Sequence, residues 1–158
     1  MANTQAMCTS FLGELLTATH NFGTAPVRAA STADTFKAAL YLTTATVNAS
    51  TTAYSSTGEV TGTNYSAGGV AVTNGTPPSS TNSSATAGVG YWTPSASITY
   101  TNVTLSTAFD TVLIYNSTQS NKAVSVHTFG SQTVTAGTFT LTMPSNTTST
   151  ALLRLATT

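Results

Sequence analysis

Two histidines and one cysteine are the side chains of this sequence best suited to metal binding or nucleophilic catalysis. A metal site usually needs three or four ligands close together, and His20, His127 and Cys8 show no such spacing along the chain. Cys8 with either histidine could form a thiol nucleophile and its base. Because Cys8 stands beside Met7 in an apolar stripe, we interpret it as a small buried hydrophobic residue. We therefore predict no catalytic and no metal-ligating residue.

Three carboxylates could carry acid–base chemistry. Glycoside hydrolysis uses a pair of carboxyl groups that flank the scissile bond, and Asp34, Glu59 and Asp110 are the candidates. Nothing in the sequence places any two of them together. Asp110 lies among apolar residues, where a partly buried carboxylate needs a partner. We expect a structural ion pair between Asp110 and either Lys37 or Arg154.

Aromatic residues suggest a third kind of site, a carbohydrate-binding platform. Trp92, Tyr91 and Tyr100 could stack against sugar rings, but we favour a place for them in the core or in an interface. The glycine-rich phosphate-binding loops of nucleotide-binding proteins and the G-x-S-x-G turn of hydrolases do not occur in the sequence. We predict that the protein is not an enzyme and binds no cofactor.

The composition favours assembly over chemistry. The 158 residues include four basic and four acidic side chains, with a net charge of zero, whereas about a quarter of the residues in a typical soluble domain are charged. There are 37 threonines and 19 serines, and β-branched threonine suits a pleated, half-buried surface. The scattered basic residues argue against nucleic-acid binding. No membrane span and no secretory signal are visible, so we expect no membrane partner and folding in the cytoplasm.

One short helix is predicted near the N-terminus. Apolar residues recur there at helical spacing and form a single stripe, which consists of Met7, Phe11, Leu12, Leu15 and Leu16. Pro26 marks the break that follows the helix. A helix of about three turns is unstable alone in water, so we expect it to pack on the domain or on a neighbouring subunit.

Short strands separated by turn residues are predicted in the rest of the chain. They are expected at residues 34–42, 70–73, 97–105, 109–115, 122–129, 138–143 and 151–155, with a short strand or an extended turn at 58–62. The apolar phase slips by one residue between Tyr100 and Val103, which predicts a β-bulge. Paired Gly68 and Gly69 predict a turn with positive φ.

These elements predict a single domain over residues 1–158. Its class is all-β, an antiparallel β-sandwich of jelly-roll-like form with one short N-terminal α-helix. Residues 1–22 are expected to form the helix and an arm, and residues 34–158 the sandwich. Residues 74–90 are expected to be one long loop, which either lies on a neighbouring subunit or forms a surface loop.

The order of the elements resembles small virion structural proteins of tailed bacteriophages, particularly those that infect aquatic bacteria. The resemblance covers most of the chain and rests on residues 8–16, 19–22, 34–41, 58–69, 112–116, 121–124 with 129–130, 136–144 and 151–155. No catalytic residues come with this resemblance. It implies a structural place in the virion, after assembly in the host cytoplasm.

We expect a non-enzymatic capsid decoration (cement) protein that binds the outer capsid lattice and stabilises it. Its partners would be the major capsid protein and further copies of itself, as a homotrimer at local threefold positions. The alternative is a tail, neck or fibre component that contacts the host surface. A tail-associated glycan hydrolase would need clustered carboxylates.

Overall fold

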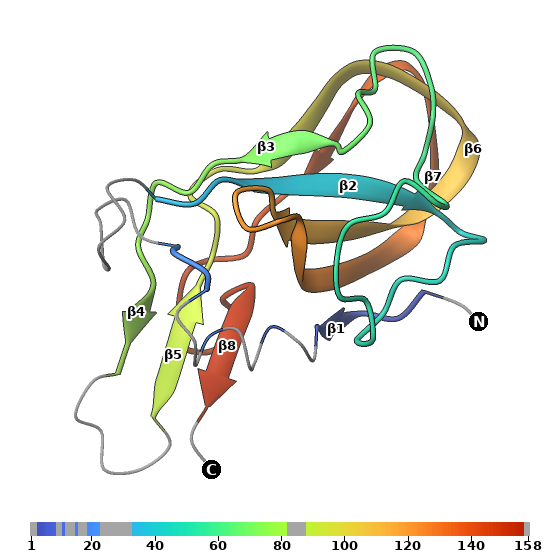
Figure 1. Ribbon diagram of the computed structural model, residues 1–158. Coiled ribbons are helices and arrows are strands. Elements are labelled where there is room, and N and C mark those ends of the chain that lie inside the picture. The colour runs from blue at the N-terminus through green and yellow to red at the C-terminus, as the bar shows by residue number, and fades with distance from the viewer. Residues whose placement is uncertain are drawn as a thin grey trace.

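The computed structural model of the chain describes residues 3–8, 11, 15, 19–22, 33–81 and 88–156. They form two antiparallel sheets (Figure 1), so the predicted all-β, sandwich-like class is confirmed. The strands are β1 (Ala6–Met7), β2 (Phe36–Leu42), β3 (Val70–Val72), β4 (Ser79–Ser80), β5 (Val89–Trp92), β6 (Ile98–Asn116), β7 (Lys122–Leu141) and β8 (Leu153–Ala156). The larger sheet has the order β1-β7-β6-β2-β3, and the smaller sheet has the order β4-β5-β8.

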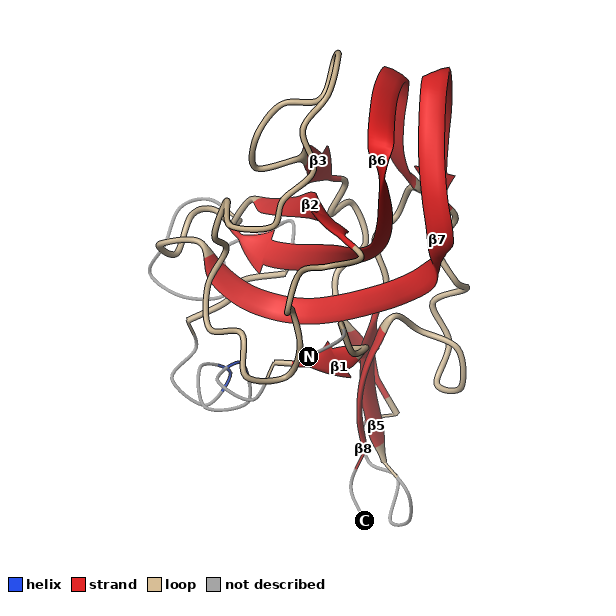
Figure 2. Cartoon of the chain, turned by 90° about the vertical axis from the view of Figure 1, so that its right-hand side faces the viewer, coloured by secondary structure: helices blue, strands red, loops and turns tan. Residues whose placement is uncertain are grey.

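The hairpin of β6 and β7 is the dominant element, with strands of 19 and 20 residues. The strands pair from the turn at residues 117–121 to Ile98 and Leu141 at the far end, and they bend sharply together (Figure 2). As a result, Phe139 in the far half of the hairpin packs edge-on against Phe109, with ring centroids 5.1 Å apart. One hairpin thus supplies both sides of part of the core.

The sequence predicted the parts of this hairpin but not its continuity. The strands expected at residues 97–105 and 109–115 are both part of β6, and those expected at 122–129 and 138–143 fall largely within β7. No strand was predicted at residues 106–108 or 130–137, which are mostly small or polar. Pairing nevertheless continues through them, because threonine is well accommodated on an exposed strand face.

Two predictions about the backbone are confirmed. The register of β6 against β7 shifts between Tyr100 and Val103, where the bulge was expected, and Asn102 has a φ of 52°. The paired glycines also turn the chain as expected, with φ of 87° at Gly68 and 71° at Gly69.

The core lies on both faces of β2 and of the adjoining half of β6. Side chains of β2 such as Phe36 and Leu40 are buried, and β2 lies between β3 and β6 in the sheet. Residues 112–115 of β6 are all buried, as predicted for a central strand covered on both faces. Full burial of one such side chain, for example Leu113, stabilises the fold by roughly 1.5–3 kcal/mol.

The N-terminal segment adds an edge strand to the larger sheet. Met7, which the sequence placed in the helical stripe, lies in β1 and pairs with Ser125 of β7, so this part of the prediction is wrong. The open edge of β7 offers hydrogen bonds that favour an extended backbone here. Phe11 and Leu15 are helical, but the rest of the predicted helix and the break at Pro26 lie outside the described residues. Within those residues no helix is seen as an element.

The stretch predicted as one long loop, residues 74–90, contains strand residues. Ser79–Ser80 form β4 and β5 begins at Val89, whereas residues 82–87 lie outside the described part of the chain. The prediction failed because serine and glycine are weak strand formers. Pairing of β5 with β4 and β8 holds this backbone extended.

Candidate functional site

Glu59 is a buried carboxylate held by neighbouring hydroxyl and amide groups. Its side chain is 7% exposed. Its Oε2 accepts a hydrogen bond from the Tyr54 hydroxyl at 2.6 Å, and its Oε1 accepts from the Tyr65 hydroxyl at 2.8 Å and from the Gly68 N–H at 2.7 Å. Three charge-assisted hydrogen bonds compensate the loss of water around this carboxylate. We call these four residues the Glu59 cluster.

Further tyrosines surround the Glu59 cluster. Burial, reinforced by the negative charge of Glu59, raises the pKa of Tyr41 to about 12 and also raises the pKa of Tyr100 and of Tyr115. The Tyr100 hydroxyl donates to the Ala38 carbonyl at 2.8 Å. These phenols remain protonated at neutral pH and act as hydrogen-bond donors, so the arrangement can hold the fold but supplies no phenolate base.

Asn116 connects His20 and Asp34 in a second buried network. Its Nδ2 lies 3.0 Å from His20 Nδ1 and donates to Asp34 Oδ2 at 2.8 Å. Its Oδ1 accepts from the backbone N–H groups of Thr118 and Gln119, both at 3.1 Å. All four hydrogen-bonding positions of the amide are therefore used. The network fixes the β6–β7 turn against the segment that precedes β2.

The structure does not pair the carboxylates that were candidates for glycoside hydrolysis. Glu59, Tyr41 and Thr111 are cross-strand neighbours on one face of the sheet. Asp110 lies at a register shift, since Tyr41 pairs with Thr111 and Leu42 with Phe109, and its carboxylate is held by other donors than those of Glu59. Asp34 bonds to Asn116 in a further network, so none of these hydrogen-bond donors is shared between two of the three carboxylates.

Asp110 has partners other than the ones expected from the sequence. Its Oδ1 accepts from the Asn3 amide at 2.9 Å and from the Thr111 hydroxyl at 2.7 Å. No ion pair with Lys37 or Arg154 is found among the described residues, and neutral donors satisfy the carboxylate instead. Asp110 thereby helps to hold the N-terminal segment on the sheet.

The proposed carbohydrate platform is not formed. Trp92 is 3% exposed, and its indole N–H lies 3.1 Å from both Asn74 Oδ1 and the Thr76 carbonyl. Tyr100 is buried against Tyr65, on a different sheet from Trp92. The interpretation of these two aromatic residues as part of the core is confirmed.

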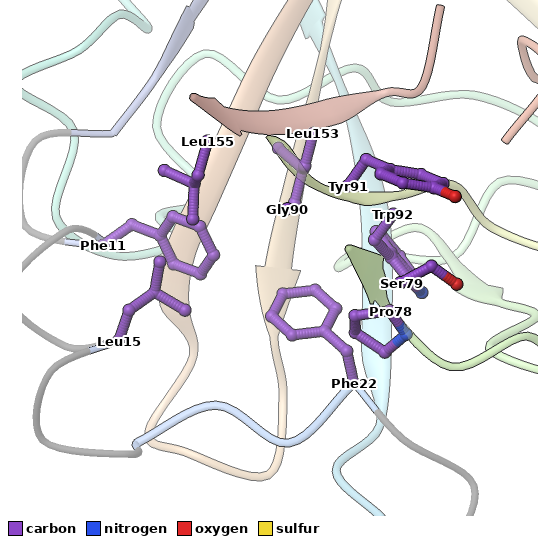
Figure 3. Close-up of a pocket in the computed structure, with 10 residues that line it drawn as sticks. All are labelled: Phe11, Leu15, Phe22, Pro78, Ser79, Gly90, Tyr91, Trp92, Leu153 and Leu155. Atoms are coloured by element: carbon purple, nitrogen blue, oxygen red, sulfur yellow. The ribbon is translucent and has the colours of Figure 1, made fainter. Parts of the chain in front are cut away.

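An apolar pocket of about 140 Å³ lies between the smaller sheet and the N-terminal segment. Figure 3 shows the side chains that surround it, and they include Phe11, Phe22, Tyr91, Trp92, Leu153 and Leu155. Leu155 at its rim is 42% exposed, the largest exposure of any bulky hydrophobic side chain among the described residues. We call this cavity the aromatic pocket.

A second pocket, of about 130 Å³, lies inside the curl of the β6–β7 hairpin. We call it the hairpin pocket, and its lining includes Ile98, Val112, Ile114, Phe129, Leu141 and His127. His127 Nε2 lies 2.9 Å from Ser125 Oγ. Burial lowers the pKa of His127 to about 4, so the imidazole is neutral near pH 7.

The Ser125–His127 contact has the distance of a nucleophile and its general base. Ser125, however, is 1% exposed and lies in the middle of the sheet, between Met7 of β1 and Ile114 of β6. A substrate cannot reach its hydroxyl. This contact orients the imidazole, and a binding role for the pocket fits the geometry better than acyl transfer.

No metal-binding group assembles in the described part of the chain. Cys8 is buried, and its backbone N–H donates to the Val124 carbonyl. Nowhere among the described residues do three His, Cys, Asp or Glu side chains gather around a point where a metal ion could bind. Nor does that part of the chain contain a helix with the length and apolar character needed to cross a membrane.

The two polar networks could not be predicted from the sequence. The partners of Glu59 lie at positions 54, 65 and 68, and those of Asn116 at positions 20 and 34, spacings that match no motif. The pairing register between β2 and β6 places Asn116 opposite Phe36. Asn116 therefore lies close to Asp34. Such contacts are determined by strand pairing rather than by local sequence.

No protein-family model, curated protein or solved structure matches this chain. The fold itself defines the class: an antiparallel, two-sheet, all-β protein with buried polar networks and two small apolar pockets.

Proposed function

We propose that this chain is a non-enzymatic structural protein of a bacteriophage virion, and specifically a capsid decoration protein that binds the outer lattice. The proposal starts from the resemblance of the sequence to small virion proteins. The observation that carries it further is an uncharged strand edge on β7.

The described residues cover the outer edge of β7 only in part. β1 pairs with it at Ser125 and Val126, and Ala53 forms a bridge to Lys122. From Thr128 to Leu141 no strand of the described residues pairs with this edge. Register irregularities interrupt the hairpin, but residues 123–153 contain no Asp, Glu, Lys or Arg.

Free soluble proteins protect such edges, commonly with charged side chains or proline, because an open edge pairs with other chains. An edge without these safeguards suits a subunit whose neighbours cover it permanently. The surface next to the edge is polar but neutral, with exposed threonines at positions 133, 135, 138, 140 and 142. Such a surface supports close packing in a lattice without repulsion between charges.

The test is the amount of this protein in purified, DNA-filled phage particles, measured by quantitative mass spectrometry against the major capsid protein. A copy number on the scale of the capsid lattice is the expected result. A copy number of a few to tens would instead identify a tail, neck or fibre component and overturn the decoration role. Absence from the particles would overturn the virion proposal altogether.

A further inference from the structure

We propose that the hairpin pocket binds a neutral, single-ring phenol, with the ring between the two halves of the hairpin and the hydroxyl group on His127. This inference concerns a cavity within one subunit. It does not depend on the proposed place of the protein in a virion.

The pocket is preformed by the curl of the hairpin. Ile98 and Leu141 come from its far half, and Val112 and Ile114 come from the half that pairs with β2. The halves are held together by aromatic packing, including Phe129 and Phe139 with ring centroids 5.3 Å apart, together with the Phe109–Phe139 contact. Binding therefore requires no assembly of the site, which reduces its entropic cost.

The size of the pocket favours a ligand with one ring. Its volume is about 130 Å³, slightly below the roughly 150 Å³ of an engineered apolar cavity that holds benzene. A six-membered ring with one small substituent approaches this limit, and a fused ring system exceeds it. Phe129 in the lining offers an aromatic neighbour for such a ring.

The lining excludes charged ligands. None of the described residues that line the pocket is Asp, Glu, Lys or Arg, and the imidazole of His127 is neutral near pH 7. A carboxylate or an ammonium group would lose its water without gaining a counter-charge. The ligand must therefore be neutral.

His127 supplies the polar contact that selects a hydroxyl group. Its Nε2 is used by Ser125, and its Nδ1 makes no hydrogen bond with the described residues. Nδ1 is a donor in one neutral tautomer and an acceptor in the other. A hydroxyl group can serve either tautomer, whereas a carbonyl can only accept and a hydrocarbon offers no hydrogen bond. A neutral ligand with a single aromatic ring and one hydroxyl group is a phenol.

The test compares phenol with toluene, which has the same number of heavy atoms but no hydroxyl group, by NMR titration at pH 7. Both probes are expected to shift the resonances of Phe129 and Met143, which line the pocket, with phenol bound roughly fivefold more tightly, as one neutral hydrogen bond predicts. In the variant His127→Phe, phenol should lose this advantage, while toluene affinity stays within about twofold. Retained toluene binding also shows that the variant is folded.

Two outcomes would overturn the proposal: phenol leaves the pocket resonances unchanged, or phenol keeps its advantage over toluene in His127→Phe. Leu152→Trp, which fills the pocket from the C-terminal segment, should abolish binding of both probes. Leu155→Trp is the matched control because Leu155 lines the aromatic pocket instead. N-acetyltyrosinamide, whose ring carries a second and larger substituent, tests the source of the phenol: its exclusion is the expected result for a free small phenol, and its binding would overturn the size argument.

Discussion

At the scale of single residues, Glu59 shows how a protein with few charged residues holds a buried carboxylate. The negative charge lies inside a set of donors supplied by Tyr54, Tyr65 and Gly68. These donors come from the chain that connects β2 to β3 and has little regular structure of its own. Glu59 therefore organises a segment that strand pairing alone leaves undefined.

We expect Glu59→Ala to lower the free energy of unfolding by about 3 kcal/mol, because three donors then lack their acceptor. Glu59→Gln, which keeps the shape and one acceptor oxygen, should lower it by about 1–2 kcal/mol. Denaturant titration monitored by tyrosine fluorescence measures both. The exposed change Thr138→Ala should stay within about 0.5 kcal/mol, and an equally small effect of Glu59→Ala would show that the cluster is not stabilising.

His127 predicts a loss of stability in acid. Its pKa is lowered to about 4 in the folded protein, whereas in the unfolded chain it is about 6.5. The folded state therefore binds fewer protons between these values, and stability that is present above pH 6.5 is lost as the pH falls toward 4. The contribution is up to about 3 kcal/mol. Denaturant titrations at a series of pH values should show this slope in the parent protein and a smaller slope in His127→Phe; identical slopes would contradict the assignment.

At the scale of elements, the irregularities of the β6–β7 hairpin include local backbone conformations that lower the free energy of unfolding. Ala136 in β7 has a φ of 44°, a region that strains any residue with a Cβ atom. Its backbone N–H donates to Thr104 Oγ1 at 3.0 Å, which holds the conformation in place.

Replacing Ala136 by glycine should raise the free energy of unfolding by about 0.5–1 kcal/mol, because glycine adopts positive φ without strain. The same replacement at Ala71, an exposed residue of β3 without positive φ, should lower it by about 0.5–1 kcal/mol. Thermal unfolding followed by circular dichroism gives both signs. A loss of stability in both variants would show that Ala136 is not strained.

The sequence predicted strands where buried and exposed side chains alternate. It missed strands whose residues are polar and are held extended only by pairing with a neighbouring strand. The alternation of residues 138–143 and the phase slip between Tyr100 and Val103 were visible because side chains on one face are apolar. Ser79, Ser80 and Gly90 carry no such signal, so β4 and the start of β5 were missed. The Glu59 cluster and the Asn116 network were beyond prediction because their members meet only after β2, β6 and β7 are in register.

At the scale of the whole molecule, hydrogen bonds of uncharged side chains hold distant segments together in the part of the chain that the structure describes. Asn3 illustrates this: its amide donates to the Leu42 carbonyl and to Asp110, and its Oδ1 accepts from the Val47 N–H. These contacts tie the N-terminal segment to the larger sheet. These contacts add little charge to the surface. The outside of the molecule therefore stays nearly neutral, which suits close packing.

We expect the double change Thr138→Lys and Thr140→Lys to block incorporation into virions while the subunit remains folded. Two positive charges next to the open edge of β7 would repel a neighbouring strand and protect the edge. Incorporation is measured by complementing a phage that lacks the gene, and folding by the thermal midpoint. The matched control, Thr57→Lys with Thr61→Lys, adds the same charge at exposed positions away from this edge. Normal incorporation of the edge variant would show that β7 is not a lattice contact.

The long hairpin also has a mechanical consequence. Forces that act on β6 and β7 in opposite senses along the strands load the ladder between them in shear, so the hydrogen bonds of one uninterrupted segment must break together. The register shifts divide that ladder into short segments, and each segment can yield and recover separately. A strand pair of this kind resists sudden strain while permitting small elastic extension.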